Sequence, residues 1–252
     1  AWILGADIAT QVNPDTKSHN MTGLMLSYTD AEMDTFDKER KVDGIISVDK
    51  LAGNVDTARY GLGAYHTRYH RSGAYLDLVT EVSKIKNKYS SRNGIRAKQD
   101  GWSAIVSAEV GHQFSLANDF FVEPQAQLMY QHLSLDSFSD KARKVDPDTI
   151  NAVRGRVGVR AGKNFVQPDS VHTNSLYGLV NVVRDFTSSP SVQVGKDKVA
   201  ENFNRTFVEV GIGGQAALGK SLSLYADGRL ERNLDGKERS GFRAKVGLKY
   251  SW

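Results

Sequence analysis

The sequence of 252 residues contains no cysteine. This absence excludes a disulfide framework and any metal site that uses cysteine ligands. The formal net charge is only +4, and the basic residues are dispersed, whereas a nucleic-acid-binding surface needs a clustered basic patch. We therefore expect no nucleic-acid partner.

Long hydrophobic runs are also missing. No apolar stretch approaches the ~20 residues that a transmembrane helix needs, and the mean hydropathy is −0.43. The strands of a membrane β-barrel alternate between lipid-facing and lumen-facing residues, so their average hydrophobicity stays low. The composition therefore argues against a helical membrane protein and leaves a membrane barrel open.

Motifs for metal or cofactor chemistry are absent as well. The six histidines are scattered and form no convincing set of metal ligands. The sequence has no nucleophile elbow, phosphate-binding loop or calcium-binding loop. We therefore expect neither a metal nor a cofactor.

The dominant pattern that is present is alternation with a period of two, and the C-terminus shows it best. One face of this segment carries Phe242, Ala244, Val246, Leu248, Tyr250 and Trp252. The other face carries Arg243, Lys245, Gly247, Lys249 and Ser251. A helix would mix these two sets, whereas a strand separates them completely.

The same alternation recurs in about eleven segments along the chain. They lie near residues 1–11, 19–30, 57–70, 73–90, 97–115, 119–137, 149–165, 171–187, 202–218, 220–233 and 238–252. Each is long enough for the ~9–11 residues of a tilted membrane strand. The pattern predicts an all-β fold, a transmembrane antiparallel β-barrel that forms a single domain over residues 1–252.

The connections between these segments alternate between short and long. Short turns are predicted at 70–73, 115–118 and 218–220, and long polar stretches at 31–56, 137–148 and 188–201. Outer-membrane barrels have short periplasmic turns and longer extracellular loops, so the long stretches are expected outside the cell. The core of the first one, Ile45–Val48, is predicted to form an extra hairpin.

Strand parity and the distribution of charge refine this prediction. Bacterial single-chain barrels have even strand numbers, so we expect about twelve strands, with the first lying upstream of Ala1 or missed in our count. Because the chain begins inside a predicted strand, we interpret it as a fragment or a mature piece. The alternative is a soluble sandwich or lipocalin-like barrel. Charges that repeat on one face, interspersed with glycine, favour a water-filled lumen instead.

Several motifs, in order along the chain, resemble the C-terminal translocator domain of type V autotransporters. They are Met21–Tyr28, Tyr60–Tyr65, Gly73–Leu78, Ala108–Gly111, Val122–Leu128, Arg156–Val159 and the terminal Gly247–Trp252. The combination of Ala108–Gly111 with Val122–Leu128 is the most specific match. The resemblance covers nearly the whole chain, although neither a pore helix nor a passenger is recognised in it.

This resemblance implies a function and a set of partners. A translocator is a monomeric twelve-stranded barrel in the outer membrane of a Gram-negative bacterium, and its pore holds an α-helical segment. It anchors an N-terminal passenger and helps to carry it to the cell surface. Its implied partners are the passenger, the pore helix, outer-membrane lipid, lipopolysaccharide and the barrel assembly machinery. That machinery reads the last strand, here through Phe242, Leu248, Tyr250 and Trp252.

The resemblance also suggests where chemistry could occur. Some family members cut their own passenger inside the pore with the help of inward acids, and Asp77 and Glu109 match such positions. Gln127 is an amide where some self-cleaving relatives have an acid. We favour the interpretation that the acids pair with lumen cations, and hence that the domain is not an enzyme. An outer-membrane enzyme of the protease type and a small-solute pore remain the alternatives.

The predicted lumen contains further residues. The side chains expected to line it are Glu123, Gln125, Gln127, Arg154, Arg156, Arg160 and Glu209. Four glycines are also expected to face inward, where they would make room for a plug or helix rather than bind phosphate: Gly61, Gly63, Gly211 and Gly213.

Overall fold

The computed structural model describes residues 1–15, 18–36, 41–42, 45–46, 51–92, 94–139, 144–165, 174–187, 191–194, 197–200, 205–219, 221–234 and 240–250. Its main feature is one large antiparallel sheet. The long strands are β1 (Trp2–Asn13), β2 (Ser18–Phe36), β5 (Leu51–His70), β6 (Ala74–Ser91), β7 (Arg96–His112), β9 (Phe120–Leu135), β12 (Ile150–Phe165), β13 (Asn174–Thr187), β16 (Arg205–Ala217), β17 (Leu222–Asn233) and β18 (Ser240–Tyr250).

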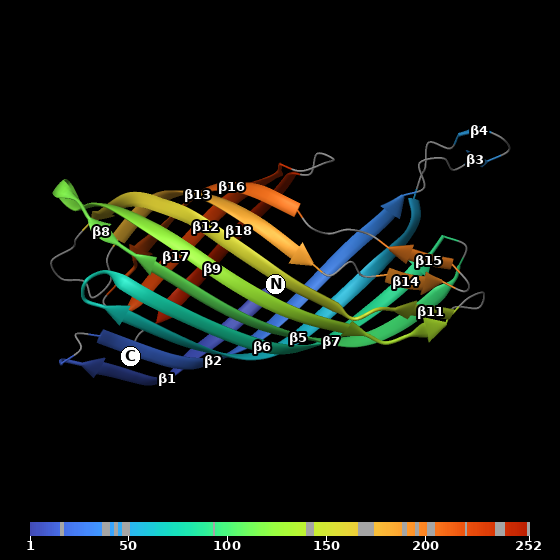
Figure 1. Cartoon of the computed structure of the whole chain (residues 1–252), viewed down its shortest axis with the longest axis horizontal. Coiled ribbons are helices and arrows are strands. Elements are labelled where there is room, and N and C mark those ends of the chain that lie inside the picture. Colours follow the sequence, from blue (N-terminus) through green and yellow to red (C-terminus); the bar gives the residue numbers. More distant parts are fainter. Residues whose placement is uncertain are drawn as a thin grey trace.

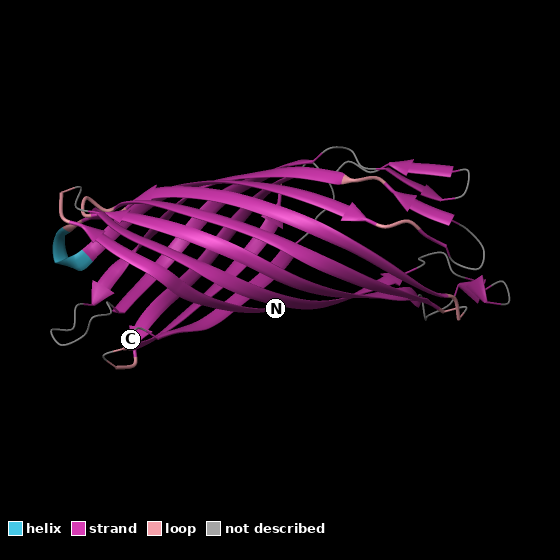
Figure 2. Cartoon of the chain, turned by 90° about the horizontal axis from the view of Figure 1, so that it is seen from below, coloured by secondary structure: helices cyan, strands magenta, loops and turns pink. Residues whose placement is uncertain are grey.

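Each long strand pairs with the long strands that precede and follow it in the chain, so the sheet is a continuous meander. Short β8 (Phe114–Ser115) pairs with β9, which makes the sheet twelve-stranded. The strands are tilted and the sheet curls into a barrel-like wall (Figure 1 and Figure 2). Its two edges are β1 and β18. The predicted all-β antiparallel fold is thus confirmed.

Helical structure is minimal in the described ranges. The short 3-10 helix η1 (Ala117–Asp119) lies in the turn between β8 and β9. Two residues of this turn, Asn118 and Asp119, have positive φ angles of 59° and 63°, a conformation that Asn and Asp tolerate better than most residues. Among the residues that the structure describes, no helix has the length and apolar character needed to span a bilayer.

The two ends of the wall differ, as the alternation of short and long connections predicted. The predicted short turns at 70–73 and 115–118 lie at one end, here called the turn end, where the Gly73 amide donates to the His70 carbonyl at 2.9 Å. The long connections lie at the opposite, loop end (Figure 1). There β2 and β5 pair as far as Phe36 and Leu51, so residues 31–36 and 51–56 continue the strands instead of forming a loop.

Additional strands occur at the loop end. The predicted hairpin around Ile45 is confirmed for β3 (Lys41–Val42) and β4 (Ile45–Ile46), which pair with each other; Ser47 and Val48 lie outside the described residues. A four-stranded sheet contains β10 (Phe138–Ser139), β11 (Lys144–Pro147), β14 (Ser191–Val194) and β15 (Asp197–Ala200). These parts of two predicted polar loops form strands because β11 and β14 satisfy each other's backbone groups.

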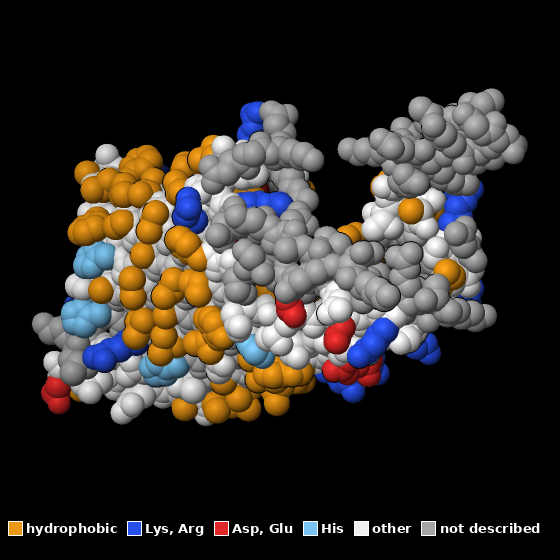
Figure 3. Space-filling view, turned by 45° about the vertical axis from the view of Figure 1, so that its right-hand side comes forward, with side chains coloured by type: hydrophobic (Ala, Val, Ile, Leu, Met, Phe, Trp, Pro, Cys, Tyr) orange, Lys and Arg blue, Asp and Glu red, His pale blue; other side chains and the backbone are white. Residues whose placement is uncertain are grey.

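The two faces of the wall have opposite chemistry. The outward residues Leu78, Val106, Val157, Val210 and Leu248 are between 40% and 64% exposed. In the described part of the chain only four hydrophobic side chains are buried, against eleven polar or charged ones. A soluble barrel would show the reverse. Figure 3 shows hydrophobic side chains covering much of the wall toward the turn end, with charged side chains gathered nearer the loop end.

A charge-paired lumen as the candidate functional site

The inner face of the wall is built by the period-two geometry of the strands. On β12, Arg154, Arg156 and Arg160 are separated by even numbers of residues, so their side chains leave the strand on the same side. Neighbouring strands bring acids and amides to the same face. Arg156 is directly opposite Gln127, and Arg160 is opposite Glu123. The predicted lumen residues of β9 and β12 therefore lie together.

The first ion pair joins Arg156 to Glu109 on β7, with 2.7 Å between Nη2 and Oε2. The Arg156 Nε also donates to Gln127 at 3.0 Å. The Tyr75 hydroxyl donates to the other Glu109 oxygen at 2.7 Å. Both charged side chains are less than 20% exposed. This arrangement links four strands, β6, β7, β9 and β12, and neutralises the carboxylate of Glu109, one of the two predicted acids.

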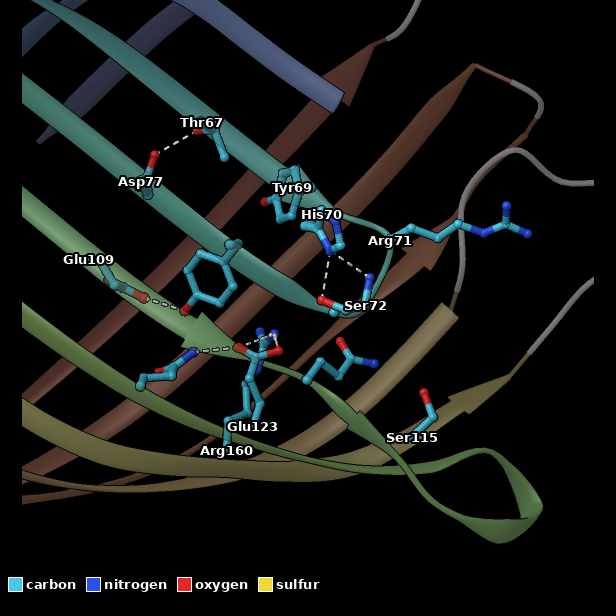
Figure 4. A pocket seen from close by; sticks show the side chains of 14 residues that line it. Thr67, Tyr69, His70, Arg71, Ser72, Asp77, Glu109, Ser115, Glu123 and Arg160 are labelled. Carbon is cyan, nitrogen blue, oxygen red and sulfur yellow. Dashed lines mark hydrogen bonds and ion pairs between the residues drawn. The ribbon is translucent and has the colours of Figure 1, made fainter. Parts of the chain in front are cut away.

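The second ion pair lies nearer the turn end, where Arg160 contacts Glu123 at 2.8 Å. Gln125 donates to the same carboxylate at 2.7 Å, and the Arg160 guanidinium lies 4.8 Å from the centre of the Tyr177 ring. Glu123 is only 2% exposed, so the hydrogen bonds and the cation compensate for its loss of water. Glu123, Gln125 and Arg160 line a cavity of about 510 Å³, and Figure 4 shows Glu123 and Arg160 at its wall.

Two further groups occupy the rest of the inner face. Arg154 and Asp185 form a bidentate pair at 2.5 and 2.8 Å, a geometry that fits the planar guanidinium. Glu209 accepts from Asn181 at 2.6 Å and pairs with Arg229 at 3.0 Å. Sequence reasoning found Glu209 and Arg154 but missed their partners, because partners on neighbouring strands follow from register rather than from residue type.

Asp77 and Glu109, the predicted self-cleavage acids, are directly opposite each other on β6 and β7. Asp77 accepts a hydrogen bond from the Thr67 hydroxyl at 2.6 Å, and the residues that the structure describes include no cation paired with it. Glu109 is held by Arg156 and Tyr75. The two acids are therefore adjacent but have different partners.

The inward glycines lie close to side chains of neighbouring strands. A methyl group on Gly213 would lie 2.5 Å from the Tyr177 hydroxyl, one on Gly61 would lie 2.3 Å from the Ser27 hydroxyl, and one on Gly63 would lie 2.5 Å from the Met25 methyl. Gly211 is close to the Arg229 stem, at 3.0 Å. Side chains of neighbouring strands therefore fill the space directly beside these glycines.

A recurring glycine–tyrosine pair explains part of this packing. In four places an inward tyrosine lies over a glycine directly opposite it on the next strand: Tyr65 with Gly23, Tyr75 with Gly111, Tyr177 with Gly213 and Tyr225 with Gly247. Sequence reasoning missed these pairs, because they depend on which residues are opposite each other on neighbouring strands. Only glycine lets the ring lie flat against the neighbouring strand.

The last strand presents its predicted aromatic and apolar residues outward. Phe242, Leu248 and Tyr250 are 72%, 64% and 62% exposed, and they lie on β18, an edge of the sheet. The fourth predicted member of this set, Trp252, lies outside the described residues.

Comparisons with known proteins agree with this architecture. Residues 1–229 match the family model described as the autotransporter beta-domain. The pertactin autotransporter of Bordetella parapertussis is 27% identical over 212 residues, which cover 79% of this chain and 22% of that protein. The BrkA autotransporter of Bordetella pertussis is 32% identical over 177 residues, covering 66% of this chain and 17% of that protein. The chain thus spans less than a quarter of the length of these relatives.

Solved structures show the same fold. The beta domain of the Bordetella autotransporter BrkA superposes with a TM-score of 0.76 at 24% identity, covering 99% of this chain and 89% of that chain. The transport unit of the autotransporter AIDA-I from Escherichia coli gives a TM-score of 0.77 at 16% identity, covering 99% and 81% of the two chains. The chain belongs to the autotransporter beta-domain family, whose members are outer-membrane proteins of Gram-negative bacteria.

Proposed function

We propose that this domain anchors a passenger in the outer membrane and helps to carry it to the cell surface. The observation that supports this most is the inside-out wall, in which apolar side chains face outward and paired charges face inward. A polar, charge-balanced lumen can accommodate a polypeptide segment without a hydrophobic surface that would bind it and stop its passage. In this proposal the loop end faces the cell exterior.

The proposal includes closure of the wall. In lipid, the unpaired backbone groups of β1 and β18 would lack hydrogen-bond partners, and each such group costs several kcal/mol. The two edges must therefore pair, either directly or through one further strand. Such a closed monomeric barrel would hold a segment of the passenger against its inner face. In the family this segment is a pore helix.

We propose a structural rather than a catalytic role for Asp77 and Glu109. Glu109 balances Arg156, and Asp77 accepts a hydrogen bond from Thr67, so each acid already has a partner within the wall. The domain carrying both Asp77→Asn and Glu109→Gln should release or retain a fused passenger as the original domain does. A change in the size of the surface-exposed passenger would instead assign these acids to self-cleavage.

We also propose that the barrel assembly machinery recognises β18. An open strand edge is a template for strand addition, and this edge strand carries the exposed Leu248 and Tyr250. Deleting residues 250–252 should leave the protein unassembled in the periplasm, whereas Lys249→Ala should be tolerated. If the deletion variant still forms a normal, heat-modifiable barrel, this role is contradicted.

The main proposal is tested by fusing a reporter passenger, with a helical linker, to the N-terminus of the domain in a Gram-negative host. We expect the reporter to be cleaved by protease added to intact cells. A small-solute pore would instead give steady conductance in planar bilayers without displaying the reporter. Reporter retained in the periplasm by a correctly inserted barrel would contradict the proposal.

A further inference from the structure

The charges of the inner face are divided unequally between two parts of the wall. Alternate residues of a strand lie on the same face, so the inward residues of β1, β2, β5, β6 and β7 follow from their sequences. In these strands they include four acids and one cation: Asp7, Asp77, Glu81, Glu109 and Arg59. This part of the wall, here called the acidic half, therefore has an excess of three acids.

The strands β9, β12, β13, β16, β17 and β18 have the opposite excess, and we call them the basic half. Their inward residues include five acids, one on each of β9, β13 and β16 and two on β17. They also include eight cations, namely the three arginines of β12 together with Arg205, Arg229, Arg243, Lys245 and Lys249. The described inner face is therefore neutral as a whole but has two oppositely charged sides.

Ion pairs compensate two acids of the acidic half but not Asp77. Glu81 pairs with Arg59 at 2.5 Å, and Glu109 pairs with Arg156, which comes from the basic half. Asp77 lies opposite Thr67 and Glu109, accepts a hydrogen bond from the Thr67 hydroxyl, and forms no ion pair within the described part of the chain. Asp77 and Thr67 line the cavity of about 510 Å³, and Figure 4 shows the two side chains turned toward each other. Asp77 therefore presents an uncompensated negative charge to the lumen.

Two lysines of the basic half, Lys245 and Lys249, are also without an ion pair in the ranges that the structure describes. Lys245 lies opposite Asp227, but the Asp227 carboxylate accepts from the Arg229 guanidinium at 2.9 Å. Lys249 lies opposite Ser223, which has no charge. Both lysines are exposed on the inner face of β18. They are the part of the cation excess that remains available to a molecule in the lumen.

Asp77 and the two lysines lie on opposite sides of the lumen at a similar depth. In the order of the long strands β6 is the fourth and β18 the eleventh, so the curl of the sheet brings them to face each other. Asp77 is three residues from the turn end of β6, which begins at Ala74. Lys249 and Lys245 are one and five residues from the turn end of β18, which finishes at Tyr250. A polypeptide segment that passes through the lumen must therefore pass between these charges.

We propose that the two halves hold the passenger segment in one rotation about its own axis, with a cationic side chain against Asp77 and an acidic side chain against Lys245. The inference rests on the proposed function, which places such a segment in the lumen. Opposite charges attract each other more strongly where protein reduces their contact with water, and the reverse rotation would bring like charges together. The partner is thus a polypeptide segment with cations along one side and acids along the other. This contact breaks no bond, so it is separate from self-cleavage.

The test uses the reporter fusion described above, with a helical linker that carries a lysine and, two positions later, a glutamate. Successive residues of a helix are about 100° apart, so these two side chains point in nearly opposite directions. A cysteine four positions after the lysine lies on the lysine side of the linker. Val79→Cys, two residues from Asp77 on the inner face of β6, reports the approach of that side by disulfide formation. The chain has no other cysteine.

A second linker exchanges the lysine and the glutamate and keeps the cysteine. The pair of charges is placed at successive turns of both linkers, and the turn that gives the strongest cross-link with either linker is used. The domain variant Asp77→Lys with Lys245→Glu reverses both charges of the lumen. The matched control, Lys144→Glu with Asp146→Lys, reverses an exposed ion pair on β11 outside the wall.

We expect the original domain to cross-link the first linker about tenfold more than the exchanged linker, because two ion pairs replace two repulsions. The reversed domain should prefer the exchanged linker, and the β11 control should behave as the original domain does. Equal cross-linking of the two linkers in the original domain, or a preference that an assembled reversed domain does not invert, would overturn the proposal. The comparison in the original domain decides it even where the reversed domain does not assemble.

Surface display of the reporter, measured on the same fusions, separates the two possible failures. Display with both linkers but without a preferred rotation would overturn this inference alone. Assembled, heat-modifiable barrel that displays the reporter with neither linker would overturn the proposed function, and this inference with it.

Discussion

The outer and inner faces of each strand differ in polarity and in exposure, whereas the strands resemble one another in this pattern. On β7, Val106 is 55% exposed, while its neighbours on the other face, Ser103 and Ser107, are 0% and 7% exposed. On β13, Val180 and Val182 are outward, and Asn181 between them is 1% exposed. A single period-two pattern therefore produces an apolar exterior and a polar interior.

This contrast shows which interactions hold each face. The exterior needs no contact with other protein groups, because lipid is as apolar as the side chains. The interior holds charges at low exposure, and Glu109, Glu123 and Glu209 each have an arginine that offsets the loss of water.

The largest expected effect comes from placing the wrong chemistry on the outer face. Val106→Arg should destabilise the barrel by about 2–4 kcal/mol, the cost of an arginine near the bilayer midplane on a lipid-facing site. Gln125→Arg, on the inner face beside Glu123, should cost much less. Denaturant unfolding in lipid vesicles measures both, and equal losses would mean that the faces have been assigned wrongly.

A smaller effect is expected from breaking an interior pair. Arg229→Leu removes the arginine at 3.0 Å from Glu209, which is 3% exposed, and leaves it only Arg243 at 4.0 Å. It also removes the partner of Asp227 at 2.9 Å. We expect a loss of roughly 2–3 kcal/mol, below the 3–5 kcal/mol of fully buried pairs because water reaches the lumen. The double variant with Glu209→Gln should recover part of it. No recovery would show that the pair is not coupled.

Filling one of the glycine positions tests the packing of the inner face. In Gly213→Ala the new methyl group would lie 2.5 Å from the Tyr177 hydroxyl and 2.9 Å from the Asp227 Cβ. We expect a loss of about 1–2 kcal/mol from overpacking, with less loss when Tyr177→Ala is present. If alanine at Gly213 costs the same with and without the Tyr177 ring, the glycine is not there to accommodate it.

The smallest effect is expected outside the wall. Lys144 and Asp146 on β11 form an ion pair at 3.6 Å, with side chains 66% and 55% exposed. Exposed pairs contribute about 0–1 kcal/mol to stability. Asp146→Asn should therefore lower the unfolding free energy by less than Arg229→Leu does. A loss as large as that of Arg229→Leu would contradict the distinction between lumen and surface charges.

Much of the wall could be predicted from alternation alone. The segment predicted at 149–165 is β12 at 150–165, and that at 73–90 is β6 at 74–91. The hydrophobic period and the turn residues are local signals, so they can be recognised in a single sequence. The side on which Arg156, Gln127 and Glu209 lie follows from the same period.

The remainder depends on register between distant residues. The pairing of Arg229 with Glu209 and the glycine–tyrosine pairs require knowing which residues are opposite each other. The sheet formed by β11 and β14 joins residues about fifty positions apart through backbone hydrogen bonds, which residue type does not encode. The predicted end of β2 at residue 30 was too early, because charged residues continue this strand beyond the apolar band.

The contrast between the two faces is tested most directly at two adjacent residues. The chain has no cysteine, so Leu128→Cys and Gln127→Cys can each carry a single fluorescent label without background. Leu128 is outward and 59% exposed, whereas Gln127 is inward and donates to Ser107 at 2.9 Å. In lipid vesicles, a quencher attached to acyl chains should quench the label at 128, and an aqueous quencher the label at 127. The opposite result, or equal quenching of both labels by the aqueous quencher, would contradict a lipid-facing apolar wall around a polar lumen.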